Sequence, residues 1–79
     1  MPPRHRKPSP ALLRILSANI VRLRDAKGWS QEELADEAGL HRTFVGSVER
    51  GERNVTISTL EAFAEAFNVS VIELLTKRR

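Results

Sequence analysis

The chain has 79 residues, a formal net charge of +3 and no cysteine. A chain this short forms one domain with a modest core, and small domains of this kind gain further stability from disulfides, metals or oligomerisation. The absence of cysteine excludes a disulfide and a thiolate metal site, so we expect a dimer, and a reducing compartment such as the cytoplasm. Apolar runs reach only three or four residues, which predicts neither a signal peptide nor a membrane span.

Positive charge is concentrated at the two ends of the chain. Six of the 13 basic residues lie among the first ten and the last three positions, whereas all ten acidic residues lie between positions 11 and 76. Nucleic-acid binding would therefore depend on where individual basic side chains sit, because the body is mildly acidic. All four prolines lie in residues 1–10, which we interpret as a disordered basic arm before a folded domain of residues 11–79. The arm is either a solvated tail or a contact to phosphates or the minor groove.

Capping signals predict an all-α domain of five helices. The first helix is expected from Pro10 to about Lys27, with Ser9 as its N-cap and Gly28 after its end. Capping boxes then predict three helix starts, near residues 31, 59 and 71, from the pairs Ser30 and Glu33, Ser58 and Glu61, and Ser70 and Glu73. The last two of these helices are expected to end near Phe67 and Lys77. Apolar spacing predicts buried faces on the first and fourth helices from Leu12, Leu16, Ile20 and Leu23, and from Leu60, Phe63, Ala64 and Phe67.

Residues 30–50 have the pattern of a helix-turn-helix. Leu34 and Ala38 face inward on its first helix, and Gly39 suits a turn with positive φ. The second helix begins after His41, a poor N-cap, and places Val45 and Val48 toward the core. Such a helix can enter the major groove of DNA. Its outward face is predicted to carry Arg42, Thr43, Gly46, Ser47 and Arg50.

Four of these residues are candidates for contacts with bases. Arg42 can pair with the O6 and N7 atoms of guanine, and the methyl group of Thr43 can meet that of thymine. Ser47 is short and would reach bases through water. Gly46 either allows the backbone to approach DNA closely or avoids a clash.

A second group is expected to contact the DNA backbone. Gln31 lies at a helix N-terminus, where free N–H groups suit a phosphate, and the neighbouring Glu32 is expected to point away. Phe44 is expected to pack at the edge of the core and to touch either sugar or a thymine methyl group. The remaining candidates follow the end of the recognition helix: Arg50, Arg53 and Asn54.

A family resemblance extends over about residues 15–76. It is carried by RLRDAKGWSQEELADEAGLHRTFVGSVERGERNVTISTLEAFAEAFNV, which resembles the helix-turn-helix domain of the phage repressor and Cro-like group. The run HRTFVGSVERGERNVTISTLE is most similar to the controller proteins of restriction–modification systems. The resemblance implies a compact, lambda repressor-like five-helix domain. It also implies a homodimer that binds a palindromic operator in double-stranded DNA and activates, then represses, its own gene and the endonuclease gene.

The resemblance bears on individual residues as well. It places Arg42 and Ser47 at base-contact positions, and it implies an ion pair between Arg24 and Glu49, which we expect to set the angle of the recognition helix. RNA polymerase is a further candidate partner. A dimer interface is predicted because the last helix is apolar on several sides. The candidates for this interface are Ile57, Phe67, Val69, Val71, Ile72 and Leu75.

The same sequence also bears on functions other than operator binding by a controller protein. No catalytic constellation, metal-ligand cluster or phosphate-binding glycine loop is visible, so neither an enzyme nor a cofactor or metal site is expected. An antitoxin or a phage-type autorepressor would use the same helix-turn-helix. A protein-interaction module on this scaffold is also open, although its face would usually expose aromatic or aliphatic side chains rather than Arg42, Thr43 and Ser47.

Overall fold

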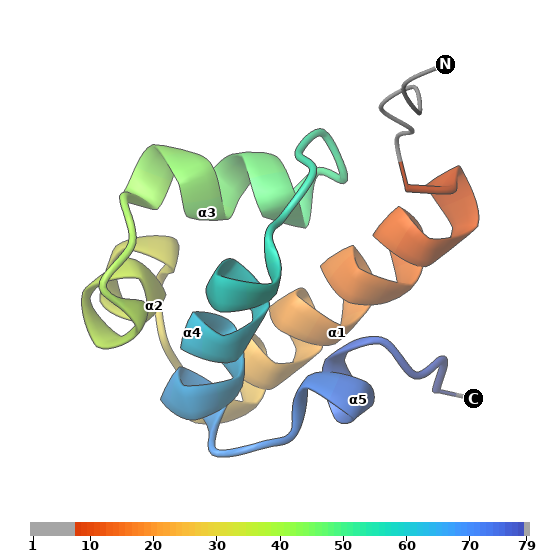
Figure 1. Ribbon diagram of the computed structural model, residues 1–79. Helices are drawn as coiled ribbons and strands as arrows, with labels where there is room; N and C mark the ends of the chain where they lie inside the picture. Colours follow the sequence, from red (N-terminus) through yellow and green to blue (C-terminus); the bar gives the residue numbers. More distant parts are fainter. Residues whose placement is uncertain (1–7, 79) are drawn as a thin grey trace.

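The structure is a computed structural model that describes residues 8–78. Within this range the chain forms five helices and no strand, which confirms the expected all-α fold: α1 (Pro10–Lys27), α2 (Gln31–Ala38), α3 (Arg42–Glu49), α4 (Ile57–Phe67) and α5 (Val71–Leu74). Helices α2 and α3 pack against each other, and the long α1 contacts α3, α4 and α5 (Figure 1). The expected arm lies largely in residues 1–7, outside the described residues.

The first two helices begin and end where their local sequence predicts. The Ser9 hydroxyl accepts the N–H of Leu12 at 3.1 Å, and α1 ends at Gly28, whose φ is +69°. Ser30 and Glu33 form both hydrogen bonds of the capping box, at 3.0 Å each. These interactions join residues a few positions apart, so short stretches of sequence are enough to predict them.

The prediction for the start of α4 was wrong by two residues. The N-cap is Thr56, whose hydroxyl accepts the N–H of Thr59 at 3.1 Å, while Ser58 lies inside the first turn. The earlier start adds a backbone bond from the Leu60 N–H to the Thr56 carbonyl, at 3.0 Å. Two good capping residues stand two positions apart here, and the longer helix forms because it satisfies more backbone groups.

The last helix is shorter than expected and ends at Leu74 instead of near Lys77. The cause is Asn19 of α1, which is 3% exposed. Its amide donates to the carbonyl oxygens of Glu73, Leu74 and Thr76 at 3.3, 2.9 and 2.9 Å. These bonds satisfy the carbonyl groups that a longer helix would have used, so the chain leaves the helix and lies along α1.

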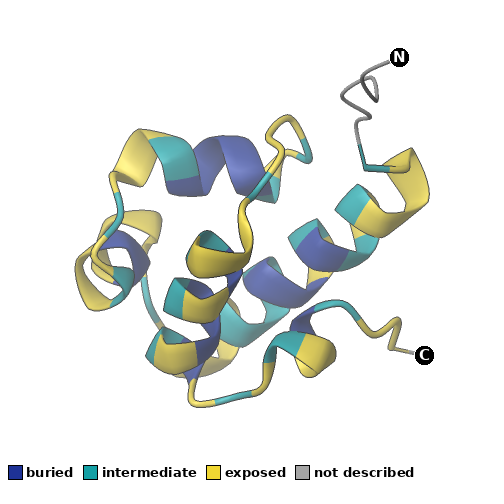
Figure 2. Cartoon of the chain, viewed as in Figure 1, coloured by how far each residue is buried: buried dark blue, intermediate teal, exposed yellow. Residues whose placement is uncertain are grey.

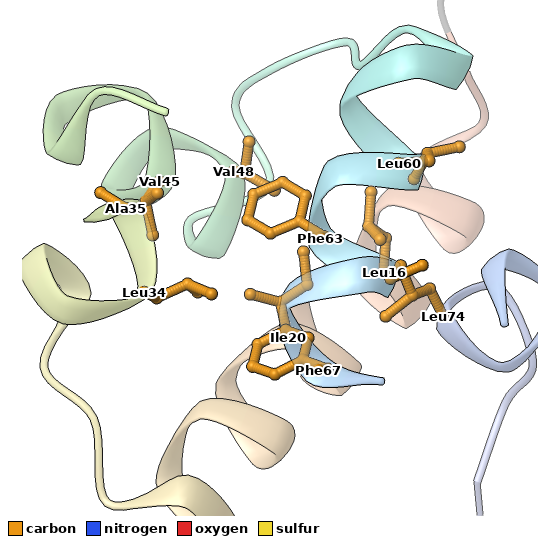
Figure 3. Close-up of a cluster of buried hydrophobic side chains, with 11 residues drawn as sticks. Leu16, Ile20, Leu34, Ala35, Val45, Val48, Leu60, Phe63, Phe67 and Leu74 are labelled. Atoms are coloured by element: carbon orange, nitrogen blue, oxygen red, sulfur yellow. The ribbon is translucent and has the colours of Figure 1, made fainter. Parts of the chain in front are cut away.

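The core lies between α1, α3 and α4 and is closed by Leu34 of α2 and Leu74 of α5 (Figure 3). The predicted buried face of α4 is confirmed, whereas Leu12 of α1 is 38% exposed. Phe67 is only 3% exposed and stacks on Trp29, with ring centroids 5.9 Å apart. Its assignment to the dimer interface was therefore wrong, because its ring is already used inside the domain.

An ion pair joins α1 to the end of α3. The Nε of Arg24 donates to one Glu49 carboxylate oxygen at 2.6 Å and its second guanidinium nitrogen donates to the other oxygen at 3.0 Å. The third nitrogen donates to the carbonyl of Trp29 at 2.8 Å. The Glu49 side chain is 6% exposed, so its charge depends on these donors. The hydrogen bond to Glu49 raises the pKa of Arg24 above its usual value, with burial acting in the opposite direction, so the arginine is charged at neutral pH.

We expect Arg24→Ala to destabilise the domain by about 3 kcal/mol, because it leaves the buried Glu49 carboxylate without its charged partner. For a domain of this size, that loss lowers the melting temperature by at least about 12 °C. The measurement is thermal unfolding followed by circular dichroism. The matched control is Arg14→Ala, which removes an exposed arginine from the same helix. Equal melting temperatures for the two variants would contradict the structural role of the pair.

Candidate nucleic-acid interface

Helix α3 is held firmly at both ends. At its start the imidazole Nδ1 of His41 accepts the N–H of Thr43 at 3.1 Å, so this histidine does cap the helix. At its end the Ser17 hydroxyl of α1 donates to the carbonyl of Val48 at 2.9 Å. Between these points Val45 and Val48 are 0% and 2% exposed and anchor the helix in the core. The exposed first turn of α3 therefore projects from a rigid base (Figure 2).

The first turn of α3 borders a groove between α2 and α3. The side chain of Arg42 is 68% exposed, and Thr43 is exposed beside it. The groove has a volume of about 560 Å³, and its lining residues are Arg24, Ser30, Gln31, Glu32, Arg42, Thr43, Gly46 and Arg50. Six of these side chains carry hydrogen-bond donors, three of them arginines, and they gather around one concave surface next to the exposed end of α3.

Two residues of the predicted outward face are buried instead. Ser47 is 9% exposed, and its hydroxyl donates to the carbonyl of Phe44 at 2.8 Å. Gly46 is also buried, beneath the side chains of Gln31 and Arg50. Ser47 is therefore not outward as predicted, whereas Gly46 does line the groove but is covered there by the side chains of Gln31 and Arg50.

The glycine at position 46 makes room for neighbours within the protein. A Cβ atom there would lie 3.2 Å from a guanidinium nitrogen of Arg50 and 3.3 Å from the amide oxygen of Gln31. Both distances are shorter than an ordinary van der Waals contact, so one of these side chains would have to shift. Of the two alternatives for Gly46, the structure supports the avoidance of a clash.

Gln31 is tied to the ion pair rather than left free for a ligand. Its side-chain amide donates to the Glu49 carboxylate at 2.9 Å, although the residue as a whole is exposed. Glu49 therefore accepts hydrogen bonds from α1 and α2 together. Gln31 therefore links α2 to the end of α3. A phosphate would have to compete with Glu49 for its amide.

The remaining backbone candidates cluster at the end of α3 and in the loop that follows. Arg50, Arg53 and Asn54 are exposed. The guanidinium of Arg53 lies over the ring of Phe44, 5.4 Å from its centroid, and its Nε donates to the Ser47 hydroxyl at 3.4 Å. Phe44 packs against the core, as expected for its edge position. The stacking holds the loop near α3 and leaves Arg53 accessible to solvent.

Glu32 lies elsewhere than the sequence suggested. It was expected to point away from the interface, yet it lines the groove and its carboxylate is 3.6 Å from a guanidinium nitrogen of Arg42. Both side chains are about two-thirds exposed, at 67% for Glu32 and 68% for Arg42. The pair forms because the start of α2 and the start of α3 face each other across the groove.

Two polar residues of α1 that join it to other parts of the fold were missed by sequence reasoning. Ser17 connects α1 to the end of α3, and Asn19 holds the C-terminal segment. A signal for Asn19 was present, since it lies between Leu16, Ile20 and Leu23 on an otherwise apolar face. A buried polar side chain at such a position needs partners, but the sequence does not say which backbone groups supply them.

Within residues 8–78 no group of three or more His, Cys, Asp or Glu side chains is placed to hold a metal ion. In the same part of the chain, no helix combines the length and the apolar character needed to span a membrane.

The clash at Gly46 can be measured with a double-mutant cycle. Alanine is more favourable than glycine inside a helix by about 1 kcal/mol. We expect Gly46→Ala to realise little of this gain, because the new methyl group displaces the Gln31 amide from Glu49. In a Gln31→Ala background more of the gain should appear. The free energies of unfolding come from urea titrations, and an equal effect of Gly46→Ala in both backgrounds would exclude the coupling.

Comparison with known proteins places the chain among DNA-binding regulators. A helix-turn-helix family profile, HTH_3, matches residues 20–74. The control protein C.SmaI of Serratia marcescens is 55% identical over 64 residues, which cover 81% of this chain and 76% of that protein. The crystal structure of the restriction-modification controller protein C.AhdI from Aeromonas hydrophila is 44% identical, with a TM-score of 0.77 over 81% of this chain and 97% of that one.

A third relative has been solved with DNA. The restriction-modification controller protein C.Esp1396I forms a tetramer in complex with its natural 35 base-pair operator. It is 38% identical to this chain, with a TM-score of 0.73 over 80% of this chain and 83% of that one. The chain therefore belongs to the helix-turn-helix family, within which it is similar to the controller proteins of restriction–modification systems.

Proposed function

We propose that this protein is a sequence-specific transcription regulator that binds a palindromic operator in double-stranded DNA as a homodimer. The observation that carries the proposal is the exposed first turn of α3, with Arg42 and Thr43 presented by a helix whose other side is buried. An arginine at this place can donate two hydrogen bonds to one guanine, which contributes about 1–3 kcal/mol of discrimination against other bases. Thr43 adds a methyl group for contact with thymine.

The surroundings of α3 support contacts to the sugar–phosphate backbone. Arg50 and Arg53 offer exposed guanidinium groups at the end of α3 and in the following loop, and Asn54 offers an amide. On the other side of the groove the N-terminus of α2 presents backbone N–H groups that suit an anion. Contacts on both sides would fix the depth and direction of α3 in the major groove. Buried Ser47 supports this helix from within, and Gly46 leaves room in the groove for the side chains of Gln31 and Arg50.

A dimer follows from the size of the reading surface and from two exposed side chains. One short helix reads few base pairs, whereas a two-fold dimer reads two half-sites about 34–36 Å apart or at a multiple of that distance. Ile57 of α4 and Ile72 of α5 are 75% and 76% exposed, which is unfavourable for large aliphatic side chains in water. We place them at the centre of the dimer interface. Val69, Val71 and Leu75 are partly buried and would line its edge.

The similarity to controller proteins supports a role in a restriction–modification system, in the cytoplasm where the DNA is. Because dimerisation would be coupled to DNA binding, the fraction of operator that is occupied would rise steeply with the concentration of the protein. Activation and later repression of a promoter would require contact with, or exclusion of, RNA polymerase, which we therefore propose as a further partner.

The test of the proposed function is selection of binding sites from a random duplex library at about physiological salt. We expect a palindrome with guanine at a fixed position of each half-site. Arg42→Ala should lose the preference for that guanine, at a cost of about tenfold or more in affinity for each half-site. Arg14→Ala, which removes an exposed arginine on α1, is the control and should keep the preference. A folded protein that enriches no sequence would refute the proposal.

Dimerisation is tested with Ile57→Glu and Ile72→Glu. Burying one isoleucine side chain contributes about 1.5–3 kcal/mol to the free energy of association, and each residue occurs twice in a two-fold interface. Each variant should therefore raise the dimer dissociation constant at least about tenfold, as measured by sedimentation equilibrium. The control is Leu12→Glu, which places the same charge on another large aliphatic residue that is exposed within residues 8–78, in α1. If all three variants dimerise equally, the interface lies elsewhere.

A further inference from the structure

We infer that a second, basic groove along α1 binds an acidic segment of a protein partner. This α1 groove lies between α1 and the residues that follow α5, and it has a volume of about 470 Å³. Four of its lining side chains are positively charged and none is acidic, unlike the groove beside α3. The lining residues are Ala11, Arg14, Ile15, Ala18, Asn19, Arg22, Lys77 and Arg78. The inference goes beyond the proposed function, because α3 contributes no residue to this site.

The cations of the α1 groove have no acidic partner in the part of the chain that the structure describes. The ion pairs within residues 8–78 join Arg24, Arg42 and Arg50 to carboxylates, and none includes a cation of this groove. The Nε of Arg22 is buried without a hydrogen-bond acceptor in the same range, and its guanidinium makes a long bond of 3.4 Å to the Asn19 amide oxygen. Cations gathered around a concave surface without acids make its potential positive. Carboxylates are suitable ligands, because hydrogen bonds between two charged groups are strong.

The spacing of the lining residues indicates the form of the ligand. Arg14, Ala18 and Arg22 form one row along α1, since residues four positions apart share a face of a helix. The two arginines are thus two turns or about 12 Å apart along the axis, with apolar Ala18 midway and partly buried Ile15 beside it. In an extended chain, side chains four positions apart lie about 13 Å apart on the same side. Two acidic residues at that spacing, with an apolar residue between them, would therefore match both the charges and the apolar floor.

The position and charge of the α1 groove argue against other ligands. Ser17 and Arg24 bind α3 from one side of α1, whereas the groove opens on the α5 side, and Figure 1 shows α3 above α1 and α5 below it. A duplex bound by α3 would therefore lie toward the other side of α1. Residues 1–10 of the chain carry three basic residues and no acid, so they would be repelled. A second copy placed across a two-fold axis would bring the same four cations opposite these four.

The experiment is a chemical-shift titration of the isotope-labelled protein with the end-blocked peptide Gly-Glu-Ala-Leu-Ala-Glu-Gly. The ionic strength is about 0.15 M, at which charges more than about 8 Å apart are largely screened. We expect the largest shifts at the backbone amides of residues 11–22, 77 and 78, and small shifts in α3. The control peptide has glutamine in place of both glutamates and should leave these amides unchanged.

Variants test whether the cations of the groove bind the peptide. Arg14→Gln and Arg22→Gln should each weaken peptide binding about two- to fivefold, which is the effect of one exposed ion pair. Arg14 is fully on the surface, so its variant tests the site even if the partly buried Arg22 is needed for folding. Lys27→Gln is the matched control, because it removes a charge from α1 outside the groove, and it should keep the affinity.

The outcomes separate the inference from the proposed function. Equal shifts with the two peptides, shifts centred on α3, or equal affinities of Arg14→Gln and Lys27→Gln would each overturn the inference. A parallel titration uses a random DNA duplex. If the duplex shifts the amides of the α1 groove and the peptide does not, the groove belongs to the DNA interface and the inference is wrong. The proposed function is judged by operator selection alone, and Arg14→Gln should select the same palindrome as the unmodified protein.

Discussion

The arrangement of the helices depends on the carboxylate of Glu49. It lies near the end of α3, and it accepts two hydrogen bonds from Arg24 of α1 and one from Gln31 of α2. A carboxylate that is 6% exposed would be very unfavourable without such partners, so the helices that supply them are constrained in position. The apolar core brings α1, α2 and α3 together, and the directional bonds to Glu49 add a further constraint on how these helices cross.

The same constraint divides α3 into two parts. Its middle is buried beneath α2 and the following loop, with Gly46 leaving space for Gln31 and Arg50. Its first turn is free, and there Arg42 and Thr43 are exposed. Rigid support matters for recognition because hydrogen bonds to base edges require side chains within a few tenths of an ångström of their targets. Few side chains remain to read bases, so a second copy of the helix is needed to specify a site.

The surface around α3 is distinguished by where its charged residues lie and not by the net charge of the domain. Residues 11–76 are mildly acidic, yet exposed arginines stand around the end of α3 and at the groove. Glu32 places an acid within that surface, in contact with Arg42. An interface of arginines alone would bind any duplex through phosphates. A second acid lies beside the end of α3, where Glu52 contacts Arg50 at 3.0 Å.

The sequence by itself determined the helical fold and the candidate recognition turn. Caps such as Ser9, Gly28 and Ser30 act over three or four residues, and the apolar period marks the buried faces, so both can be recognised locally. Where two caps compete, as at Thr56 and Ser58, local rules left the start of α4 two residues in error. The tertiary structure alone decided that Asn19 ends α5, that Gln31 bonds Glu49 and that Ser47 is buried. The bonds of Asn19 and Gln31 join residues between 18 and 57 positions apart, so their partners are chosen by packing, which no short stretch of sequence records.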